Sequence, residues 1–204
     1  ILSGTYAHGG LDEPVSVEDP CPHCDGDLEL TYGGERAAVG CVDCGVVLQR
    51  SSLPPGVFAD RDGSALPRVF DRWLRSQVRG IADGFCMACD GPVEPTMTVD
   101  DTGLDGYDEA AAPAAYYECL RCGNRVASTV PEATLYEPAV VAFHHEHGID
   151  VTETPSWALP WLYDEPEVHG QDPLEVSVTV RLAESEESLV LVVGDDLRVR
   201  EERR

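Results

Sequence analysis

The 204-residue chain carries 14 basic residues against 38 acidic ones, a formal net charge of −24 at neutral pH. Its length and its 43% of hydrophobic residues are sufficient for a packed core, which excludes wholesale disorder. No apolar run reaches the length of a membrane span, and no signal segment marks secretion. The acidity excludes a generally basic nucleic-acid binder, so we expect a cytoplasmic globular protein.

All the basic residues are arginines, and the sequence contains no lysine. Carboxylate side chains keep a protein soluble better than long lysine stems do, and molar salt screens their mutual repulsion. This composition therefore favours a halophilic organism with a salt-filled cytoplasm. An ordinary acidic protein that happens to lack lysine is the alternative. The chain begins at Ile1 rather than at a methionine, and we expect it to be a piece of a longer protein.

Every cysteine belongs to a C-x-x-C pair. The pairs are Cys21/Cys24, Cys41/Cys44, Cys86/Cys89 and Cys119/Cys122. In an intracellular protein this spacing indicates metal ligation, because a tight two-residue turn directs both thiolates at one ion. A glycine follows each pair (Gly26, Gly45, Gly91 and Gly123), and we expect it to adopt the positive φ of the turn.

The order C-x-x-C-D-G followed by C-x-x-C-G occurs twice, which indicates an internal duplication. It predicts that the first pair shares an ion with the second, and the third with the fourth. An acidic, glycine- and alanine-rich stretch, Asp100–Pro113, reads as an insertion that lengthens the second repeat. We predict two closed four-cysteine zinc sites, with rubredoxin-like iron or a redox dithiol as alternatives. His23, inside the first pair, is expected to be a bystander.

Short strand-like runs surround each set of cysteines, as in a zinc ribbon. The runs are Leu28–Tyr32, Arg36–Val39 and Val46–Gln49 in the first ribbon (residues 20–65), and Val93–Val99, Ala115–Glu118 and Arg125–Ser128 in the second (residues 85–130). The glycine pair Gly33-Gly34 predicts a hairpin between the first two runs.

Between the ribbons, residues 66–84 predict a linking amphipathic helix over Leu66–Ala82. Its apolar face consists of Leu66, Val69, Phe70, Trp73, Leu74, Val78 and Ile81. Four arginines, Arg68, Arg72, Arg75 and Arg79, form a row on the opposite face and are candidate partner-binding residues. Pairing of this arginine row with acidic residues of the same chain is the alternative.

Residues 131–204 predict a helix over Pro138–His147 followed by an antiparallel meander. His144, His145 and His147 end that helix, either as metal ligands or as cations that favour a helix C-terminus. Trp157 and Trp161 serve either an aromatic pocket or the core. The meander's strands are expected at Leu174–Leu182, Leu189–Val193 and Leu197–Arg200. The predicted fold class is α+β: two four-cysteine zinc ribbons joined by an amphipathic helix, then a helix and a C-terminal antiparallel β-meander.

Several motifs together resemble the C-terminal region of haloarchaeal ArsR-like winged-helix transcriptional regulators. They are Phe70-Asp-Arg-Trp between the cysteine pairs, the segment from Pro138 to Gly148, the Trp-x-x-x-Trp at Trp157 and the closing meander. The resemblance implies a winged helix-turn-helix domain before Ile1, with residues 1–19 as the linker from it. DNA would be bound through that missing domain, because no recognition helix is expected within these 204 residues.

The sequence thus predicts a regulatory or assembly module of a DNA-binding transcription regulator, with two zinc ions and no membrane partner. Its expected task is either self-association as a homodimer or sensing, and in both cases it would bias the winged helix. A free-standing zinc-ribbon adaptor for RNA or a protein, docking through the arginine row, is one alternative. A rubredoxin-like electron carrier is another. We expect no enzymatic activity, since the cysteines are engaged as ligands and the sequence shows no nucleophile with a neighbouring base.

Overall fold

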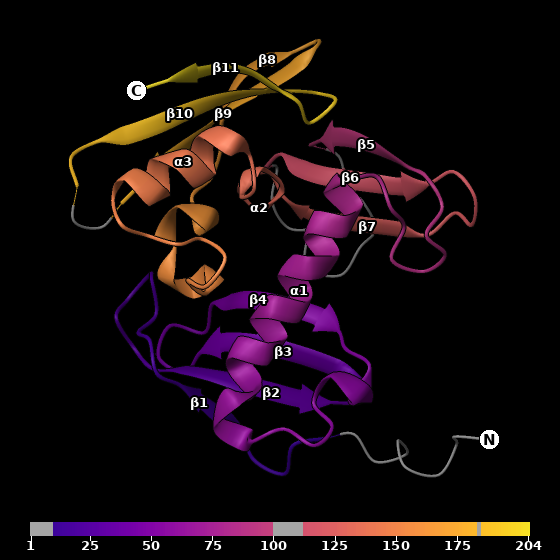
Figure 1. Ribbon diagram of the computed structural model, residues 1–204, viewed down its shortest axis with the longest axis vertical. Coiled ribbons are helices and arrows are strands. Elements are labelled where there is room, and N and C mark those ends of the chain that lie inside the picture. The colour runs from indigo at the N-terminus through magenta and orange to yellow at the C-terminus, as the bar shows by residue number, and fades with distance from the viewer. Residues whose placement is uncertain (1–9, 100–111, 183–184) are drawn as a thin grey trace. The chain divides into compact units, whose positions relative to one another are not determined.

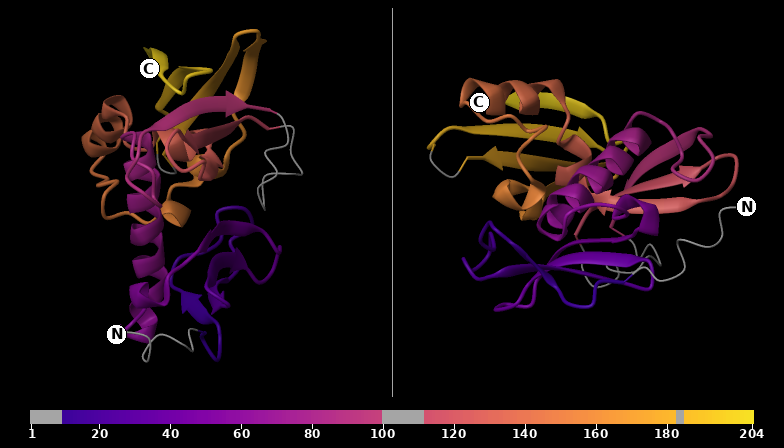
Figure 2. Two further views of the ribbon diagram at one scale, coloured as in Figure 1. Left: turned by 90° about the vertical axis from the view of Figure 1, so that its right-hand side faces the viewer. Right: turned by 60° about the horizontal axis from the view of Figure 1, so that its bottom comes forward.

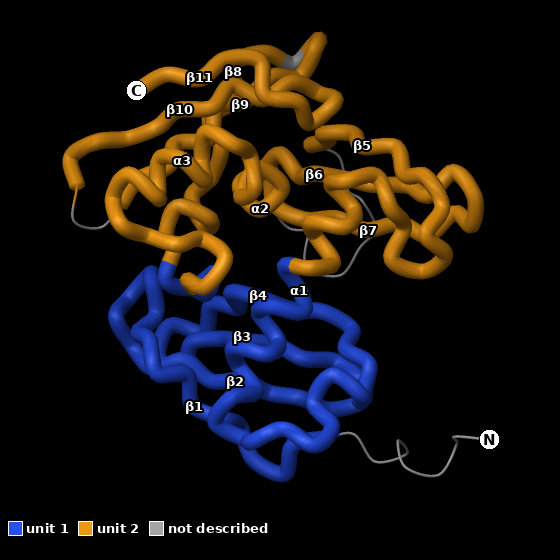
Figure 3. The backbone as a smooth tube through the Cα atoms, in the orientation of Figure 1, with its two compact units in different colours: residues 1–75, 155–158 blue, residues 76–154, 159–204 orange. Residues whose placement is uncertain are grey.

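The computed structural model describes residues 10–99, 112–182 and 185–204. The chain forms two compact units (Figure 3). Unit 1 contains the chain up to Arg75 together with Pro155–Ala158, and unit 2 contains Ser76–Thr154 and Leu159–Arg204. Both units combine helix with antiparallel sheet, so the predicted mixed class is confirmed.

Unit 1 is built on a four-stranded antiparallel sheet in the order β1-β2-β3-β4 (Figure 1). Its strands are β1 (Val15–Val17), β2 (Leu28–Gly33), β3 (Arg36–Cys41) and β4 (Val47–Ser52). Gly34 and Glu35 both have positive φ and form the two-residue turn of the predicted hairpin. Strand β1 pairs with β2, so residues expected to serve only as a linker contribute to the sheet. The first nine residues of that expected linker lie outside the described part of the chain.

One face of this sheet is buried because apolar residues alternate along its strands. The first half of α1 (Leu66–Ala82) lies beside the sheet in both orientations (Figures 1 and 2). Two short 3-10 turns, η1 (Pro55–Val57) and η2 (Gly63–Ala65), precede the helix. A third turn, η3 (Ser156–Ala158), comes from the distant segment that also belongs to unit 1.

Helix α1 has the predicted bounds, but its buried face differs from the predicted one. Asp71 and Arg75 are buried, whereas Val69 and Trp73 are only half-buried. The buried face therefore includes one member of the arginine row. Hydrophobic spacing could not reveal this difference, because it treats polar residues as exposed. Asp71 and Arg75 are buried because they pair with each other as an ion pair.

Unit 2 contains a three-stranded antiparallel sheet and a four-stranded one. The first has the order β5 (Val93–Thr98), β6 (Ala114–Cys119) and β7 (Arg125–Thr129). The second runs β11-β10-β9-β8, formed by β8 (Glu167–Gln171), β9 (Leu174–Arg181), β10 (Ser188–Gly194) and β11 (Val199–Arg203). Residues 100–111 of the predicted insertion lie outside the described residues.

Three helical segments complete unit 2: α2 (Val130–Thr134), α3 (Pro138–Glu146) and the turn η4 (Pro160–Tyr163). Helix α3, which packs beside β9 and β10 (Figures 1 and 2), ends one residue earlier than predicted. Sequence reasoning missed α2 and β8. Helix α2 has only one turn beyond its capping box at Thr129, and β8 is a polar edge strand without hydrophobic alternation.

The units divide the chain differently from the segments expected from the sequence. Residues 85–130 and 131–204 do not separate, because one apolar core takes Met97 from β5 and Val130 from α2 together with side chains of α3, β9 and β10. Helix α1 is divided between the units after Arg75. Trp157 and Trp161 are both buried, which supports the core-packing interpretation of these tryptophans.

Candidate metal centres

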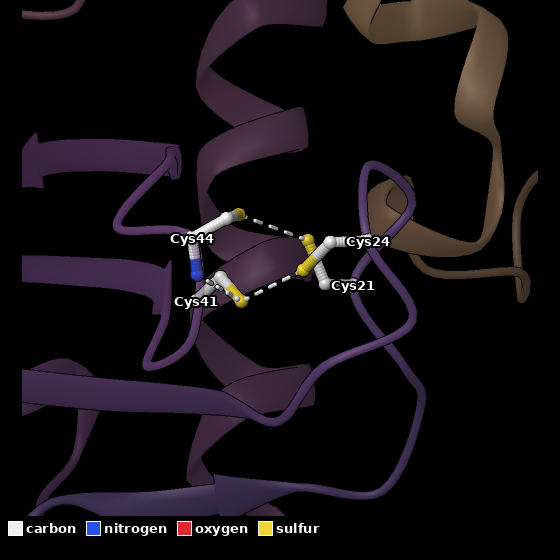
Figure 4. Close-up of side chains that lie close together, drawn as sticks. All are labelled: Cys21, Cys24, Cys41 and Cys44. Carbon is white, nitrogen blue, oxygen red and sulfur yellow. Dashed lines mark hydrogen bonds between the residues drawn. The ribbon is translucent and has the colours of Figure 1, made fainter.

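Two groups of four cysteines come together in the structure. One joins Cys21 and Cys24 to Cys41 and Cys44; the other joins Cys86 and Cys89 to Cys119 and Cys122. The sulfur atoms within each group lie within 4.8 Å of one another. The first group is formed by two loops that direct their thiols toward one another (Figure 4). The structure thus brings together the two sets that the duplicated order predicts.

The sulfur spacing fits a tetrahedral ion. In the first group Cys21 Sγ lies 3.8 Å from Cys44 Sγ, and Cys24 Sγ lies 3.5 Å from Cys41 Sγ. The corresponding distances in the second group are 3.8 and 3.6 Å. An ideal tetrahedron with metal–sulfur bonds of about 2.3 Å has sulfur–sulfur edges of about 3.8 Å. These separations are far longer than the roughly 2.05 Å of a disulfide. The donor set therefore suits a closed zinc or iron site.

All four cysteine loops share one backbone pattern. In each, the N–H of the first cysteine donates to the carbonyl five residues later, and the N–H four residues later donates to the carbonyl of that cysteine. For the first loop these bonds join Cys21 to Gly26 and Asp25 to Cys21, both at 2.9 Å. The same pairs of bonds occur at Cys41, Cys86 and Cys119. We call each such loop a knuckle.

The residue with positive φ in each knuckle is not always the glycine that the sequence predicts. It is Asp25, Gly45, Asp90 and Gly123 in the four knuckles. The prediction is correct for Gly45 and Gly123 and wrong for Gly26 and Gly91. Aspartate is one of the few non-glycine residues that tolerate this conformation, so the first and third knuckles need no glycine for it.

Gly26 and Gly91 instead allow a side chain of the neighbouring knuckle to come close to the backbone. A Cβ atom on Gly26 would lie 2.8 Å from the Cβ of Asp43, and one on Gly91 would lie 2.9 Å from the Cβ of Arg121. Real Cβ atoms essentially never come so close, and both obstructing atoms are fixed near the backbone. The glycine of the first knuckle in each centre thus makes room for a side chain of the second knuckle.

That side chain spans the two knuckles with opposite chemistry in the two centres. Asp43 Oδ2 accepts the backbone N–H of Asp27 at 2.9 Å. Arg121 stands at the equivalent place and donates from Nη1 to the carbonyl of Cys89 at 3.3 Å. Pro92 occupies the place of Asp27, and because proline has no N–H, a carboxylate there would have no donor.

Backbone N–H groups also point at the sulfur atoms. Cys44 N donates to Cys41 Sγ at 3.5 Å, and Cys122 N donates to Cys119 Sγ at the same distance. These backbone bonds are the largest influence that lowers the pKa of Cys41 to about 7 and the pKa of Cys119 to about 6. The backbone bond from Gly26 acts to lower the pKa of Cys24, but the neighbouring thiols Cys44 and Cys41 raise it to about 12. Each centre therefore holds a thiol whose thiolate form, the form that ligates metals, is favoured.

The histidines do not add ligands to a centre. Within the described ranges, the two groups able to hold a metal ion consist of cysteines alone, so neither His23 nor the histidines of α3 join them. His144 is fully buried, with Nδ1 2.8 Å from the carbonyl of Val140 and Nε2 accepting the indole N–H of Trp161 at 3.2 Å. Burial lowers the pKa of His144. The expected role as a helix-end cation is therefore wrong for this residue.

The arginine row is not a uniform docking face. Arg75 Nε lies 3.2 Å from Asp71 Oδ2, and both side chains are almost completely buried. Arg68 lies 3.5 Å from Asp19, and Arg79 lies 3.9 Å from Asp83 and over the ring of Tyr136. These contacts follow the alternative interpretation, in which acids of the same chain pair with the arginines. The proposed docking role of Arg75 is excluded by its burial.

Sequence reasoning missed a buried polar cluster around Asp71 in unit 1. Asp71 Oδ1 accepts the side-chain N–H of Gln49 at 2.8 Å and the backbone N–H of Ser156 at 3.1 Å. Asp71, the only acid in a helix with four arginines, was the available signal. Hydrophobic spacing did not single it out, because spacing along a helix cannot show what packs against a polar side chain.

Comparison with known proteins identifies one family. The model of a family described as a domain of unknown function, DUF7351, matches residues 18–199. No curated protein matches the chain. No solved structure matches it either.

The described helices include none that is both long and apolar enough to cross a membrane.

Proposed function

We propose that this chain, which belongs to the DUF7351 family, is a two-zinc-ribbon module that serves the regulation or assembly of a DNA-binding transcription regulator. Each four-cysteine group holds one zinc ion, and helix α1 joins the two ribbons. Both ribbons act as structural supports rather than as catalytic centres.

The observation that carries this proposal is the pair of four-sulfur groups built on four equivalent knuckles. Four thiolates complete the tetrahedral shell of zinc, so such a site offers no open position for a substrate. When bound, the ion cross-links the two loops of its centre in addition to the hydrogen bonds that already join them. Much of the folding free energy of each ribbon, on the order of 10 kcal/mol, then comes from the metal.

The regulatory part of the proposal rests on the resemblance to haloarchaeal ArsR-like regulators. DNA is bound through an N-terminal winged helix that precedes Ile1, in the cytoplasm of a halophilic archaeon. The net charge of −24 opposes direct approach of this module to phosphate groups, which fits a division of labour between the two domains. Its own task is then to pair two copies of the regulator or to transmit a signal to the DNA-binding domain.

The alternative of an electron carrier draws support from one feature, the N–H groups directed at the sulfur atoms, which suit iron as well as zinc. The adaptor alternative loses support, because the arginine row on which it depends is partly buried and mostly paired within the chain.

The test starts from the coding sequence immediately upstream of Ile1. A helix-turn-helix that reads into Ile1 supports the proposal, and a start codon directly before Ile1 contradicts it. The complete regulator is then purified in molar KCl and its metal content is measured. We expect two zinc ions per chain, no visible iron–thiolate absorption, and DNA binding that is lost when the winged helix is deleted. A coloured protein with one or two iron ions would favour the electron carrier instead.

A further inference from the structure

Residues 155–158 form an unusual part of unit 1. They lie about eighty positions beyond Arg75, the last preceding residue of that unit, and the residues on both sides of them, Thr154 and Leu159, belong to unit 2. Within this short segment Ser156 and Trp157 are buried, and Trp157 is among the largest fully buried side chains of the protein. Unit 1 therefore holds a piece of chain whose two flanks continue into the other unit.

Two carboxylates of unit 1 hold this segment. Asp71 Oδ1 accepts the backbone N–H of Ser156 at 3.1 Å, and Asp19 Oδ2 accepts the indole N–H of Trp157 at 2.7 Å. Hydrogen bonds to ionised acceptors are the stronger kind, and burial strengthens them further. Asp71 is itself fixed by Gln49 and Arg75, so the acceptor for Ser156 is rigid.

The acceptor for Trp157 depends on the first metal centre. Asp19 is separated from the ligand Cys21 by Pro20 alone, and the proline ring restricts the backbone between them. Cys21 is fully buried and begins the first knuckle, whose position relative to the second knuckle is fixed by the four-sulfur group. Removing the ion takes away the four-sulfur link between the two knuckles and leaves the hydrogen bonds that Asp27 makes with Asp43 and Val42. The frame that aims the Asp19 carboxylate at the indole is then loosened.

We propose that residues 155–158 are a metal-coupled tether: the ion in the first centre holds Asp19 in place for Trp157, and a seated Trp157 in turn strengthens retention of that ion. The coupling must act in both directions, because the same four states are compared in each case: metal bound or absent, with Trp157 seated or released. The tether rests on the proposed function only in requiring zinc in the first centre. Whether the first centre holds its ion thus determines how firmly residues 155–158 are held, and the chain continues on both sides of this segment into unit 2.

The first experiment measures zinc release to a chelator from the native chain and from Trp157→Phe, which keeps the aromatic ring but removes the N–H donor. Trp161→Phe is the matched control, since that buried indole donates to His144 in unit 2. We expect one of the two ions to leave about tenfold faster in Trp157→Phe, as for the loss of one charge-assisted hydrogen bond. The other ion should leave at the native rate, and Trp161→Phe should leave release from the first centre unchanged.

Cadmium-113 replacement assigns the faster ion, because its NMR signal couples to the cysteine protons of its own centre. If Trp157→Phe does not fold, Asp19→Asn replaces it, with the neighbouring exposed Glu18→Gln as control. The amide oxygen still accepts the bond without the charge, so a smaller acceleration of the same ion is expected.

The second experiment reads the coupling in the other direction by fluorescence. A chain with Trp73→Phe and Trp161→Phe retains Trp157 as its single tryptophan. Adding Cys24→Ser should shift its emission to longer wavelength, whereas adding Cys89→Ser should not. Two bound ions with equal release rates in native and Trp157→Phe chains would overturn the tether and leave the proposed function standing. A native chain without zinc would overturn both.

Discussion

The two four-cysteine groups are built on the same loop hydrogen bonds and differ in the side chain that spans their knuckles. A carboxylate, Asp43, reaches a backbone N–H in the first centre, whereas a guanidinium, Arg121, reaches a carbonyl in the second. The shared requirement is the glycine beneath that side chain, at Gly26 and Gly91. The two repeats therefore share their cysteine ligands, their turns and the glycine that makes room for the spanning side chain. The spanning side chain itself differs: a carboxylate suits Asp27, which has a backbone N–H to donate, and does not suit the equivalent residue Pro92, which has none.

The surroundings of the two centres differ as well. Unit 1 buries an ion pair, Asp71 with Arg75, and uses it to hold a distant segment. Unit 2 buries the imidazole of His144, which accepts the indole N–H of Trp161. The apolar core of this unit takes side chains from two sheets and α3. The first arrangement depends on a matched partner for every charge, and the second depends on one histidine remaining neutral.

The largest effect is expected from removing one ligand at a time. Cys86→Ser should lower the zinc content from two ions per chain to one and destabilise the second ribbon by much of the metal's contribution, on the order of 10 kcal/mol. Cys21→Ser should do the same to the first ribbon. Elemental analysis with chelator titration measures both. Loss of both ions in either variant would show that the centres are not independent.

Breaking the buried ion pair should have the next largest effect. Asp71→Leu leaves Arg75 buried without its carboxylate, which we expect to lower the free energy of unfolding by about 3–5 kcal/mol. The double variant Asp71→Leu/Arg75→Leu should recover part of this loss, but not all, because Gln49 and Ser156 also lose their acceptor. Denaturant unfolding of the single and double variants measures the coupling. A double variant less stable than Asp71→Leu would contradict it.

The spanning side chains predict a smaller effect at the two glycines. Gly26→Ala and Gly91→Ala should each cost about 1–3 kcal/mol, because the added methyl group meets Asp43 or Arg121. Asp25→Gly, in the adjacent positive-φ position, should be neutral or slightly stabilising and serves as the control. The steric interpretation predicts that Gly26→Ala costs less stability in a chain whose Asp43 side chain has been shortened than in the native chain. An equal loss of stability in the two chains would exclude it.

The smallest effect is a pH dependence confined to unit 2. The folded-state pKa of His144 is lowered by burial, so the unfolded chain takes up the proton first as the pH falls below about 6.5. The stability contributed by the neutral imidazole is therefore complete above that pH and is lost below it. His144→Gln should flatten the stability curve between about pH 6.5 and 5 relative to the exposed His145→Gln. Identical slopes in the two variants would contradict this assignment.

Local sequence determined the features that depend on neighbours along the chain. The cysteine spacing and the duplicated order predicted which four thiols gather in each centre, and helical periodicity predicted the bounds of α1. Turn chemistry predicted the hairpin after β2, because two-residue turns are read from the residues that form them.

Tertiary structure decided the features that depend on what packs against a side chain. Periodicity placed Arg75 opposite the apolar face of α1 and did not single out Asp71, yet each supplies the partner that offsets the desolvation of the other. The roles of Gly26 and Gly91 likewise depend on tertiary contacts, because it is Asp43 and Arg121, from the other knuckle of each centre, that leave no room for a Cβ atom there. Asp19 and Trp157 lie 138 positions apart, and no local pattern relates a carboxylate to an indole N–H that is so distant in the sequence.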